Sequence, residues 1–348
     1  MPYSLNMESL GRHEKEKKHL HIVKKQYTSD LRGFLFSPPC AISPHQRTMK
    51  TLLVVNPAAG YGRGKKTFER LEPRLRAEMP GLEVRFSEHP GHAVTIGREA
   101  AGAGYDRLLC LGGDGTPFEV INGLYAEGRP ARVPEIGQIP AGTGNSFLRD
   151  FDIQTPEQAL EAILAGRRRK VDLVEFHYQE AGRTVRRYSL NIIGVGLIAD
   201  ILQLTNERLK FLGAAGYSLA VLIRLARGMS NRIVIEADGR RLEFADSALV
   251  ISNSKYTGGK MKIAPPADAS DGRADLVLFN GVNRREIVAI FGGVFSGKHM
   301  SHPKVETLQA AAISVEADPA LRLMADGELL GDTPLRIRVL PAELTFLA

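Results

Sequence analysis

An acidic residue, Asp114, lies among glycines in the stretch Gly112-Gly113-Asp114-Gly115-Thr116, directly after the apolar run LLCL. Glycines that follow a strand expose backbone N–H groups, which can form a concave site for an anion. Thr116 can cap a helix that begins at 118 and can donate its hydroxyl to a phosphate. A carboxylate beside phosphates needs a cation between them or a proton to accept, and phosphoryl transfer supplies both. Alone, the stretch is more typical of an Asp-Gly turn.

Two later stretches favour the phosphate-binding interpretation. PAGTGN, at 140–145, again follows a predicted strand and offers Thr143 and Asn145 to a ligand. In MADGELLGDTP, Asp326 and Glu328 are two residues apart, so on a strand both would face one side. Paired carboxylates suit a site with a general base and a metal. Taken singly, this last motif is better explained as a hairpin turn with an exposed Glu.

The elements expected to position these loops alternate between strands and helices over residues 51–150. Short apolar strands alternating with helices indicate a parallel sheet with helices on both faces. Ligands bind such a sheet where strands end and glycine-rich loops begin, and NPAAGYGRG, GGDGT and PAGTGN follow three of the strands. We expect a kink at Pro73. The expected strands are 51–55, 83–87, 105–113 and 135–140, and the expected helices are 64–79, 92–103, 118–128 and 155–166.

The pattern changes near residue 150, where strand-like segments bounded by Asp-Gly turns become frequent. We therefore expect an α/β fold in which a parallel-sheet domain at 50–150 precedes a mainly antiparallel, β-rich domain at 151–348. Expected strand segments include 186–193, 241–252 and 307–317, and expected helices are 197–209, 216–227 and 284–296. The apolar helices between 197 and 225 would pack in the core or line a lipid pocket, with the core as the default.

The first 49 residues differ from the rest and are expected to be disordered, with Met49 as a candidate natural start. They carry eight Lys or Arg and four Asp or Glu, so they hold +4 of the formal net charge of +7. The remaining +3 gives no argument for nucleic-acid binding. No apolar stretch is long enough to span a bilayer. Two cysteines without a pairing or metal pattern favour a cytoplasmic protein, and the sequence is compatible with a homo-oligomer.

These motifs occur in one order that resembles a known family. NPAAG, GGDGT, Glu119, PAGTGN and the late DGE together resemble the diacylglycerol kinase catalytic family, in particular its bacterial lipid kinases, with sphingosine and ceramide kinases as relatives. The resemblance covers residues 50–348. It implies an ATP-binding domain, a β-sandwich second domain and an active site in the cleft between them.

The resemblance also implies roles for particular residues. Asp326 or Glu328 would accept the proton of the acceptor hydroxyl, while Asp114 would hold metal or water. A structural Mg²⁺ would be held by Asp268, Asp271 and the backbone near Arg273. Nucleotide contacts would come from Asn56, Ser87, Gly112, Gly113, Asp114, Gly115, Thr116 and Thr143.

The sequence departs from the family pattern beside the phosphate loop. The family usually has a polar residue where Phe118 stands and commonly Asp where Ser146 stands, and Pro117 removes one backbone donor. Proline fits the first turn of a helix, so we expect the fold to survive.

We expect an ATP- and Mg²⁺-dependent kinase that phosphorylates a hydroxyl of diacylglycerol or a related lipid during transient contact with a membrane. The same features leave a sphingoid-base or other lipid kinase open. An NAD kinase would share GGDGT but would leave PAGTGN and DGE unexplained. A non-catalytic lipid-binding protein is the remaining alternative, suggested by Pro117 and Phe118.

Overall fold

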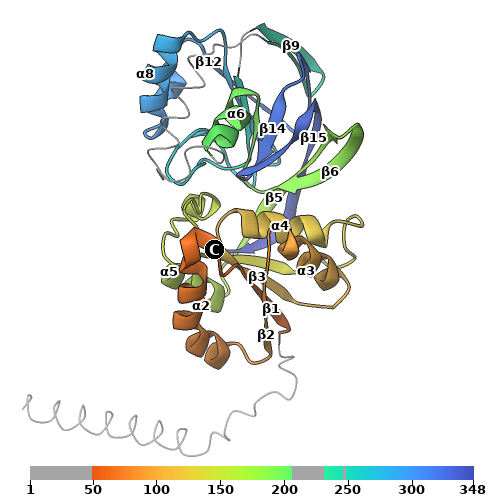
Figure 1. The fold of residues 1–348 in the computed structure, drawn as a ribbon, viewed down its shortest axis with the longest axis vertical. Helices are drawn as coiled ribbons and strands as arrows, with labels where there is room; N and C mark the ends of the chain where they lie inside the picture. Colours follow the sequence, from red (N-terminus) through yellow and green to blue (C-terminus); the bar gives the residue numbers. More distant parts are fainter. Residues whose placement is uncertain (1–48, 206–230, 246–247) are drawn as a thin grey trace, which may run out of the picture. The chain divides into compact units, whose positions relative to one another are not determined.

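The computed structural model describes residues 49–205, 231–245 and 248–348 (Figure 1). The predicted tail, apart from Met49, and the predicted helix at 216–227 lie outside these ranges. Among the described helices, none combines the length and the apolar character needed to cross a bilayer.

A parallel sheet forms the first half of the described chain, as predicted. Its strands are β1 (Thr51–Val55), β2 (Leu82–Phe86), β3 (Arg107–Gly112) and β4 (Glu135–Pro140), paired in the order β2-β1-β3-β4. In Figure 1, α2 (Ala59–Glu78) and α5 (Pro156–Leu164) lie on one side of this sheet, with α3 (His92–Ala101) and α4 (Gly115–Leu124) on the other. Since β1, β3 and β4 run the same way, their glycine-rich loops leave from the same edge.

Two helices begin earlier than the sequence pattern predicts. The α2 helix contains a break at Gly60, Tyr61 and Gly62, which have φ values of +57°, +60° and +85°. The backbone dihedrals stay helical at Pro73, and the kink predicted there stays a prediction. The α4 helix begins at Gly115, and its N-cap residue is Asp114. Thr116 therefore lies inside the first turn and does not cap the helix.

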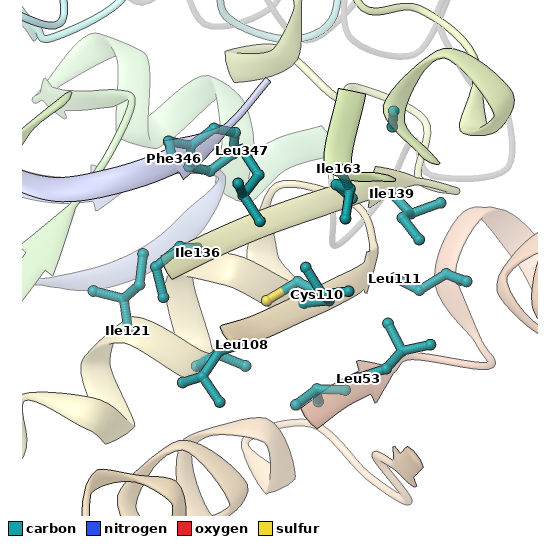
Figure 2. Packing of buried hydrophobic residues seen from close by; sticks show 14 of the residues in the cluster. Leu53, Leu108, Cys110, Leu111, Ile121, Ile136, Ile139, Ile163, Phe346 and Leu347 are labelled. Carbon is teal, nitrogen blue, oxygen red and sulfur yellow. The ribbon is translucent and has the colours of Figure 1, made fainter. Parts of the chain in front are cut away.

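The buried face of the parallel sheet forms one hydrophobic core with its helices (Figure 2). Strand residues such as Leu108 and Cys110 pack there, and Cys110 is fully buried, as its apolar setting predicted. Ile163 of α5 and Phe346 near the end of the chain belong to the same core. The domain boundary at 150 stays a prediction. Side chains that follow residue 150 in the sequence also belong to this first core.

The second half is mainly antiparallel and sandwich-like, as predicted. The strand β15 (Glu328–Leu347) pairs antiparallel with β14, β13 and β5, and its last residues pair parallel with β4. This part also contains the helices α6 (Leu197–Leu204) and α8 (Arg284–Val294) and the short 3₁₀ segment η4 (Lys298–Ser301), whereas the 3₁₀ segment η1 (Phe147–Phe151) contributes Phe147 and Leu148 to the first core. Its other strands are β5 (Arg168–Glu180), β6 (Arg183–Ser189), β7 (Ile192–Val195), β8 (Arg232–Ala237), β9 (Arg240–Ala245), β10 (Ala248–Ser252), β11 (Ala274–Phe279), β12 (Val305–Ala310), β13 (Ala312–Asp318) and β14 (Arg322–Ala325).

Three segments predicted as single strands are each two strands. The segment 186–193 spans β6 and β7, 241–252 spans β9 and β10, and 307–317 spans β12 and β13. The first break has a clear cause, because the backbone N–H groups of Leu190 and Asn191 donate to a buried carboxylate, that of Asp326, which interrupts the strand.

The helix α4 is attached to both halves of the described chain. Its residue Phe118 is only 7% exposed and packs in the core of the antiparallel half with Val174 and Phe176. Asn122 Nδ2 donates to the carbonyl of Tyr188 at 2.8 Å, and the N–H of Tyr188 donates to Asn122 Oδ1 at 2.9 Å. The glycine-rich loop at the start of α4 is therefore held in place relative to β6.

Candidate active site

A cavity of about 550 Å³ takes its lining from both halves of the described chain. Its polar lining comes from the loops after β1, β3 and β4 and from the turn between β14 and β15. Its apolar lining comes mainly from α6, α8 and β10. A polar region that adjoins an apolar wall suits a ligand with one charged and one hydrocarbon part.

The loops after β3 and β4 touch through their backbones. A Cβ placed on Gly142 would lie 2.3 Å from Gly113 Cα, and one placed on Gly113 would lie 3.2 Å from Gly142 Cα. Only glycine permits this approach, which leaves the backbone N–H groups of both loops close to the cavity.

Asp114 links the same two loops through its carboxylate. The N–H of Ser146 donates to both of its oxygens at 2.9 Å, and Oδ2 lies against Gly144. Burial raises the pKa of Asp114, while the Ser146 hydrogen bond opposes that rise. The acid therefore serves to fix the loop, and it also lines the cavity, where a cation or water could reach it.

The spacing of Asp326 and Glu328 suggested that both lie on one strand, but the structure separates them. Asp326 and Gly327 have φ values of +50° and +93° and form the two-residue turn between β14 and β15, with Glu328 opening the next strand. Both φ values are positive, which is the geometry of the tight hairpin turns that Asp-Gly favours. The hairpin interpretation is therefore correct, and both acids still line the cavity.

Asp326 is buried and fully engaged in hydrogen bonds. Its Oδ1 accepts from Ser189 Oγ at 2.7 Å and from the N–H groups of Asn191 and Ile192 at 3.0 Å, and its Oδ2 accepts from the N–H of Leu190 at 2.9 Å. Burial raises the pKa of Asp326 to about 6, and these donors oppose the rise. Its carboxylate therefore orders the segment 189–192, which supplies part of the cavity wall.

Glu328 has no hydrogen-bond partner among the described residues. Its Oε1 lies beside the glycine-rich loop after β3, since a Cβ on Gly115 would be 3.0 Å away. Desolvation raises the pKa of Glu328, and the nearby carboxylates of Glu119 and Asp326 raise it further. Glu328 is exposed as a residue, and it lines the cavity with Oε1 beside Gly115. An unengaged carboxylate with a raised pKa is suited to accept a proton.

Several predicted nucleotide contacts lie elsewhere or are otherwise engaged. Ser87 is buried at the end of β2, where its N–H donates to the carbonyl of Val55, and it does not line the cavity. Asn145 closes its own loop, because its side chain both donates to and accepts from the backbone of Gly142. Thr116 Oγ1 is buried against Gly112 without a partner among the described residues. The cavity lining does include Asn56, Gly113, Asp114, Gly115, Thr116 and Thr143, and their contact with a nucleotide stays a prediction.

The predicted metal residues form a separate turn. Asp268 Oδ1 accepts from the N–H and hydroxyl of Ser270, and Asp271 Oδ1 accepts from the N–H of Arg273 at 2.9 Å. Within the described ranges, no group of three His, Cys, Asp or Glu side chains is close enough to hold a metal. Desolvation raises the pKa of the neighbouring Asp172, and the negative charges of Asp271 and Asp268 raise it further.

The apolar wall is the part of the site for which the sequence left two alternatives open, the core and a lipid pocket, with the core as the default. Leu197, Ile198, Ile201 and Leu202 of α6 line the cavity together with Phe291 of α8. The first four lie in a segment assigned by default to the core. The signal that was available is the predominance of apolar residues in this segment, LIADILQL, which only Asp200 and Gln203 interrupt.

Comparison with known proteins assigns each half of the chain to a domain family, and the family of the first half is the one that the sequence motifs resemble. Residues 50–176 match the diacylglycerol kinase catalytic domain family, and residues 191–348 match the YegS C-terminal NAD kinase beta sandwich-like domain family. The diacylglycerol kinase of Staphylococcus carnosus (strain TM300) is 30% identical over 288 residues, which covers 81% of this chain and 89% of that protein. The diacylglycerol kinase of Staphylococcus aureus (strain JH9) is 31% identical over 288 residues, with 81% and 87% covered.

Solved structures share the fold. A crystal structure of a diacylglycerol kinase from Bacillus anthracis str. Sterne has a TM-score of 0.64 and 23% identity, and it covers 87% of this chain and 98% of its own. A further structure from that organism has a TM-score of 0.72 and 24% identity, with 88% and 97% covered.

Proposed function

Since this chain belongs to the diacylglycerol kinase catalytic-domain family and is a phosphotransferase with an alcohol group as acceptor, we propose that it transfers the γ-phosphate of ATP to the hydroxyl of diacylglycerol or a related membrane lipid. The observation that carries this proposal is a single cavity that joins close-packed glycine loops to an apolar wall, with Glu328 beside the phosphate loop. ATP would occupy the glycine loops, and the lipid hydrocarbon would lie against α6 and α8.

The phosphates of ATP would be held mainly by the backbone. The N–H groups around Gly113 and Gly115 and the start of α4 favour negative charge, because unpaired amides and the helix dipole point the same way. Thr143 lies on the adjoining loop and lines the cavity. Preorganised donors of this kind stabilise charge without having to reorganise during the reaction.

Glu328 would accept the proton of the lipid hydroxyl as that oxygen attacks the γ-phosphorus. Asp326 is a poorer candidate because its oxygens already accept four hydrogen bonds. Its role would be to hold the segment 189–192 and, through the turn, the position of Glu328. Glu119 contributes by keeping the pKa of Glu328 raised.

Mg²⁺ fits the chemistry of the residues present. Four carboxylates, those of Asp114, Glu119, Asp326 and Glu328, line the same cavity as the proposed phosphate site, so a divalent cation would offset repulsion between them and ATP. Mg²⁺ bound with the nucleotide supplies neutralisation of the phosphate charge. Asp114 would hold this metal or a water. A second Mg²⁺ would be structural, held by Asp268, Asp271 and the backbone near Arg273.

We propose that the reaction takes place at the cytoplasmic surface of a membrane, during transient peripheral contact. The apolar lining of the cavity supports this, since a substrate with acyl chains resides in a bilayer. Glu328 lies at the polar part of the cavity. The lipid hydroxyl would therefore have to leave the bilayer to reach it.

Incubation with labelled ATP, Mg²⁺ and a panel of acceptors tests the proposal. Diacylglycerol, a sphingoid base, ceramide and NAD would be offered in parallel, with a chelator added to a duplicate set. We expect label in diacylglycerol and loss of transfer with the chelator. Preferred labelling of the sphingoid base would reassign the lipid class, preferred labelling of NAD would replace the proposal, and a folded protein that labels none of them would overturn it.

A further inference from the structure

The polar region of the cavity is unusually acidic for a site that would bind a nucleotide. Its described lining includes four carboxylates, those of Asp114, Glu119, Asp326 and Glu328, and no Lys, Arg or His. A triphosphate brings several further negative charges to the same region. Binding therefore calls for a protein cation close to the rim, in addition to any metal.

Arg63 lies at that rim because the chain turns sharply just before it. Gly60, Tyr61 and Gly62 all have left-handed backbone conformations, and Tyr61 adopts this conformation although it has a side chain and is 75% exposed. A left-handed tyrosine is strained, so the turn is a specific feature of this loop. The turn brings the guanidinium of Arg63 back over Gly60, where a Cβ would lie 2.6 Å from Nε.

The guanidinium of Arg63 bridges two of the glycine loops. Its Nε donates to the carbonyl of Gly60 at 3.0 Å, and its Nη2 donates to the carbonyl of Gly142 at 3.0 Å and to Thr143 Oγ1 at 3.4 Å. These three acceptor residues line the cavity. No acidic residue in the described part of the chain pairs with this guanidinium.

These contacts leave part of the guanidinium available. An arginine side chain has five N–H donors in a rigid fork. The three contacts use Nε and Nη2, while Nη1 has no partner among the described residues. A guanidinium fixed by backbone carbonyls, with one nitrogen open, is ready to donate to a phosphate without losing side-chain entropy.

We propose that Arg63 binds the phosphate groups of the nucleotide, with its Nη1 donating to phosphate oxygens while Nε and Nη2 hold the loops after β1 and β4 together. The identity of the nucleotide rests on the proposed function. Arg63 is the protein cation of the phosphate subsite, and Thr143 is its neighbour there.

Calorimetric titration with three probes separates phosphate binding from loop structure. ATP carries base and phosphates, inorganic tripolyphosphate carries only phosphates, and adenosine carries only the base. The variants are Arg63→Gln, which removes the charge, and Arg63→Lys, which keeps the charge but loses the fork. Arg70→Gln is the matched control, because Arg70 is on the same helix and pairs at the surface with Glu157 at 2.9 Å.

We expect Arg63→Gln to weaken ATP and tripolyphosphate by about 10-fold or more, the factor that corresponds to roughly 1.4 kcal/mol, and to leave adenosine binding unchanged. The affinities of Arg63→Lys for ATP and tripolyphosphate should lie between those of Arg63→Gln and wild type. Those of Arg70→Gln should match wild type. If Arg63→Gln weakened the binding of adenosine and ATP equally, or did not weaken the binding of tripolyphosphate, the inference would be overturned. Arg63 would then only hold the two loops together.

The outcome is separable from that of the proposed function. Wild-type protein that binds tripolyphosphate through Arg63 but labels no lipid would keep the subsite and overturn the kinase assignment. If the wild-type protein labels lipid but its affinity for tripolyphosphate does not depend on Arg63, the kinase assignment is kept and the Arg63 subsite is overturned.

Discussion

The two carboxylates beside the β14–β15 turn differ because their hydrogen bonds differ. Asp326 accepts four hydrogen bonds from the segment 189–192, whereas Glu328 accepts none from the described residues and lies beside Gly115. A carboxylate that is already saturated gains little by taking a proton from a substrate. The catalytic proton acceptor should therefore be Glu328, with Asp326 as its positioning residue.

Replacing Glu328 by Gln should lower kcat by about 100-fold to 10,000-fold, the usual contribution of a positioned general base. The substitution is nearly isosteric and removes no hydrogen bond to a described residue, so the melting temperature should stay unchanged. Steady-state kinetics and thermal unfolding check both points, with Glu316→Gln, an exposed site on β13, as the control. Near wild-type turnover in Glu328→Gln would rule out this role.

The pH dependence of kcat should reflect the environment of Glu328. The base works only when ionised, so kcat should rise with pH through a pKa above the ordinary value of 4.5. Glu119 raises this pKa through its negative charge. Replacing Glu119 by Gln removes that charge, favours the ionised form of Glu328, and should move the rising limb to lower pH. If kcat of Glu119→Gln rises over the same pH range as that of wild type, a group other than Glu328 controls the rise.

At the scale of elements, the site depends on how closely the glycine loops pack. Gly142→Ala would place a methyl group 2.3 Å from Gly113 Cα, which is a backbone atom that can move only with its loop. We expect kcat/KM for ATP to fall by about 100-fold, the cost of displacing a binding group by about 1 Å.

The control for this substitution is Gly102→Ala. Gly102 ends α3, its φ is −100°, and an added Cβ would meet no atom within 4 Å. Both variants should be folded by circular dichroism. Unchanged ATP kinetics in Gly142→Ala would show that the contact between the loops is not needed for nucleotide use.

The sequence predicted elements well where hydrophobicity alone decides them. The strands β1 and β4 were predicted with the bounds that the structure has, because Asn56 and Pro57 follow the apolar run of β1 and Pro140 ends β4. The start of α4 was misplaced because glycines at a helix N-terminus leave no helical pattern. The bend at Gly60–Gly62 was missed because a left-handed tyrosine has no sequence signature.

At the scale of the whole described chain, Phe118 connects the phosphate loop to the second core. It belongs to α4, three residues after Gly115, yet it packs against Val174 and Phe176. Truncation to Phe118→Ala should lower the free energy of unfolding by about 3–5 kcal/mol, as for other buried phenylalanines. Denaturant unfolding measures this, and Phe295→Ala, at a side chain that is 52% exposed, should cost far less. Equal costs would place Phe118 outside the core.

The polar side of the candidate site was predicted from sequence more sharply than its apolar side. The loops and acids carry motif signals, and Asp114, Thr143 and Glu328, which those signals pointed to, line the cavity. The apolar wall comes from α6, α8 and β10, which are far apart in the sequence and share no motif. Their common position follows from the pairing of β7 with β10 and β14, which single-sequence periodicity does not specify.

The central claim is that this one cavity passes the terminal phosphate of ATP to a lipid hydroxyl. The most direct test compares γ-labelled with α-labelled ATP, in the presence of Mg²⁺ and diacylglycerol micelles, and measures label in the organic-extractable lipid. We predict that only the γ label enters the lipid and that Glu328→Gln nearly abolishes this transfer. Equal absence of both labels from the lipid, with folded protein, would contradict the claim.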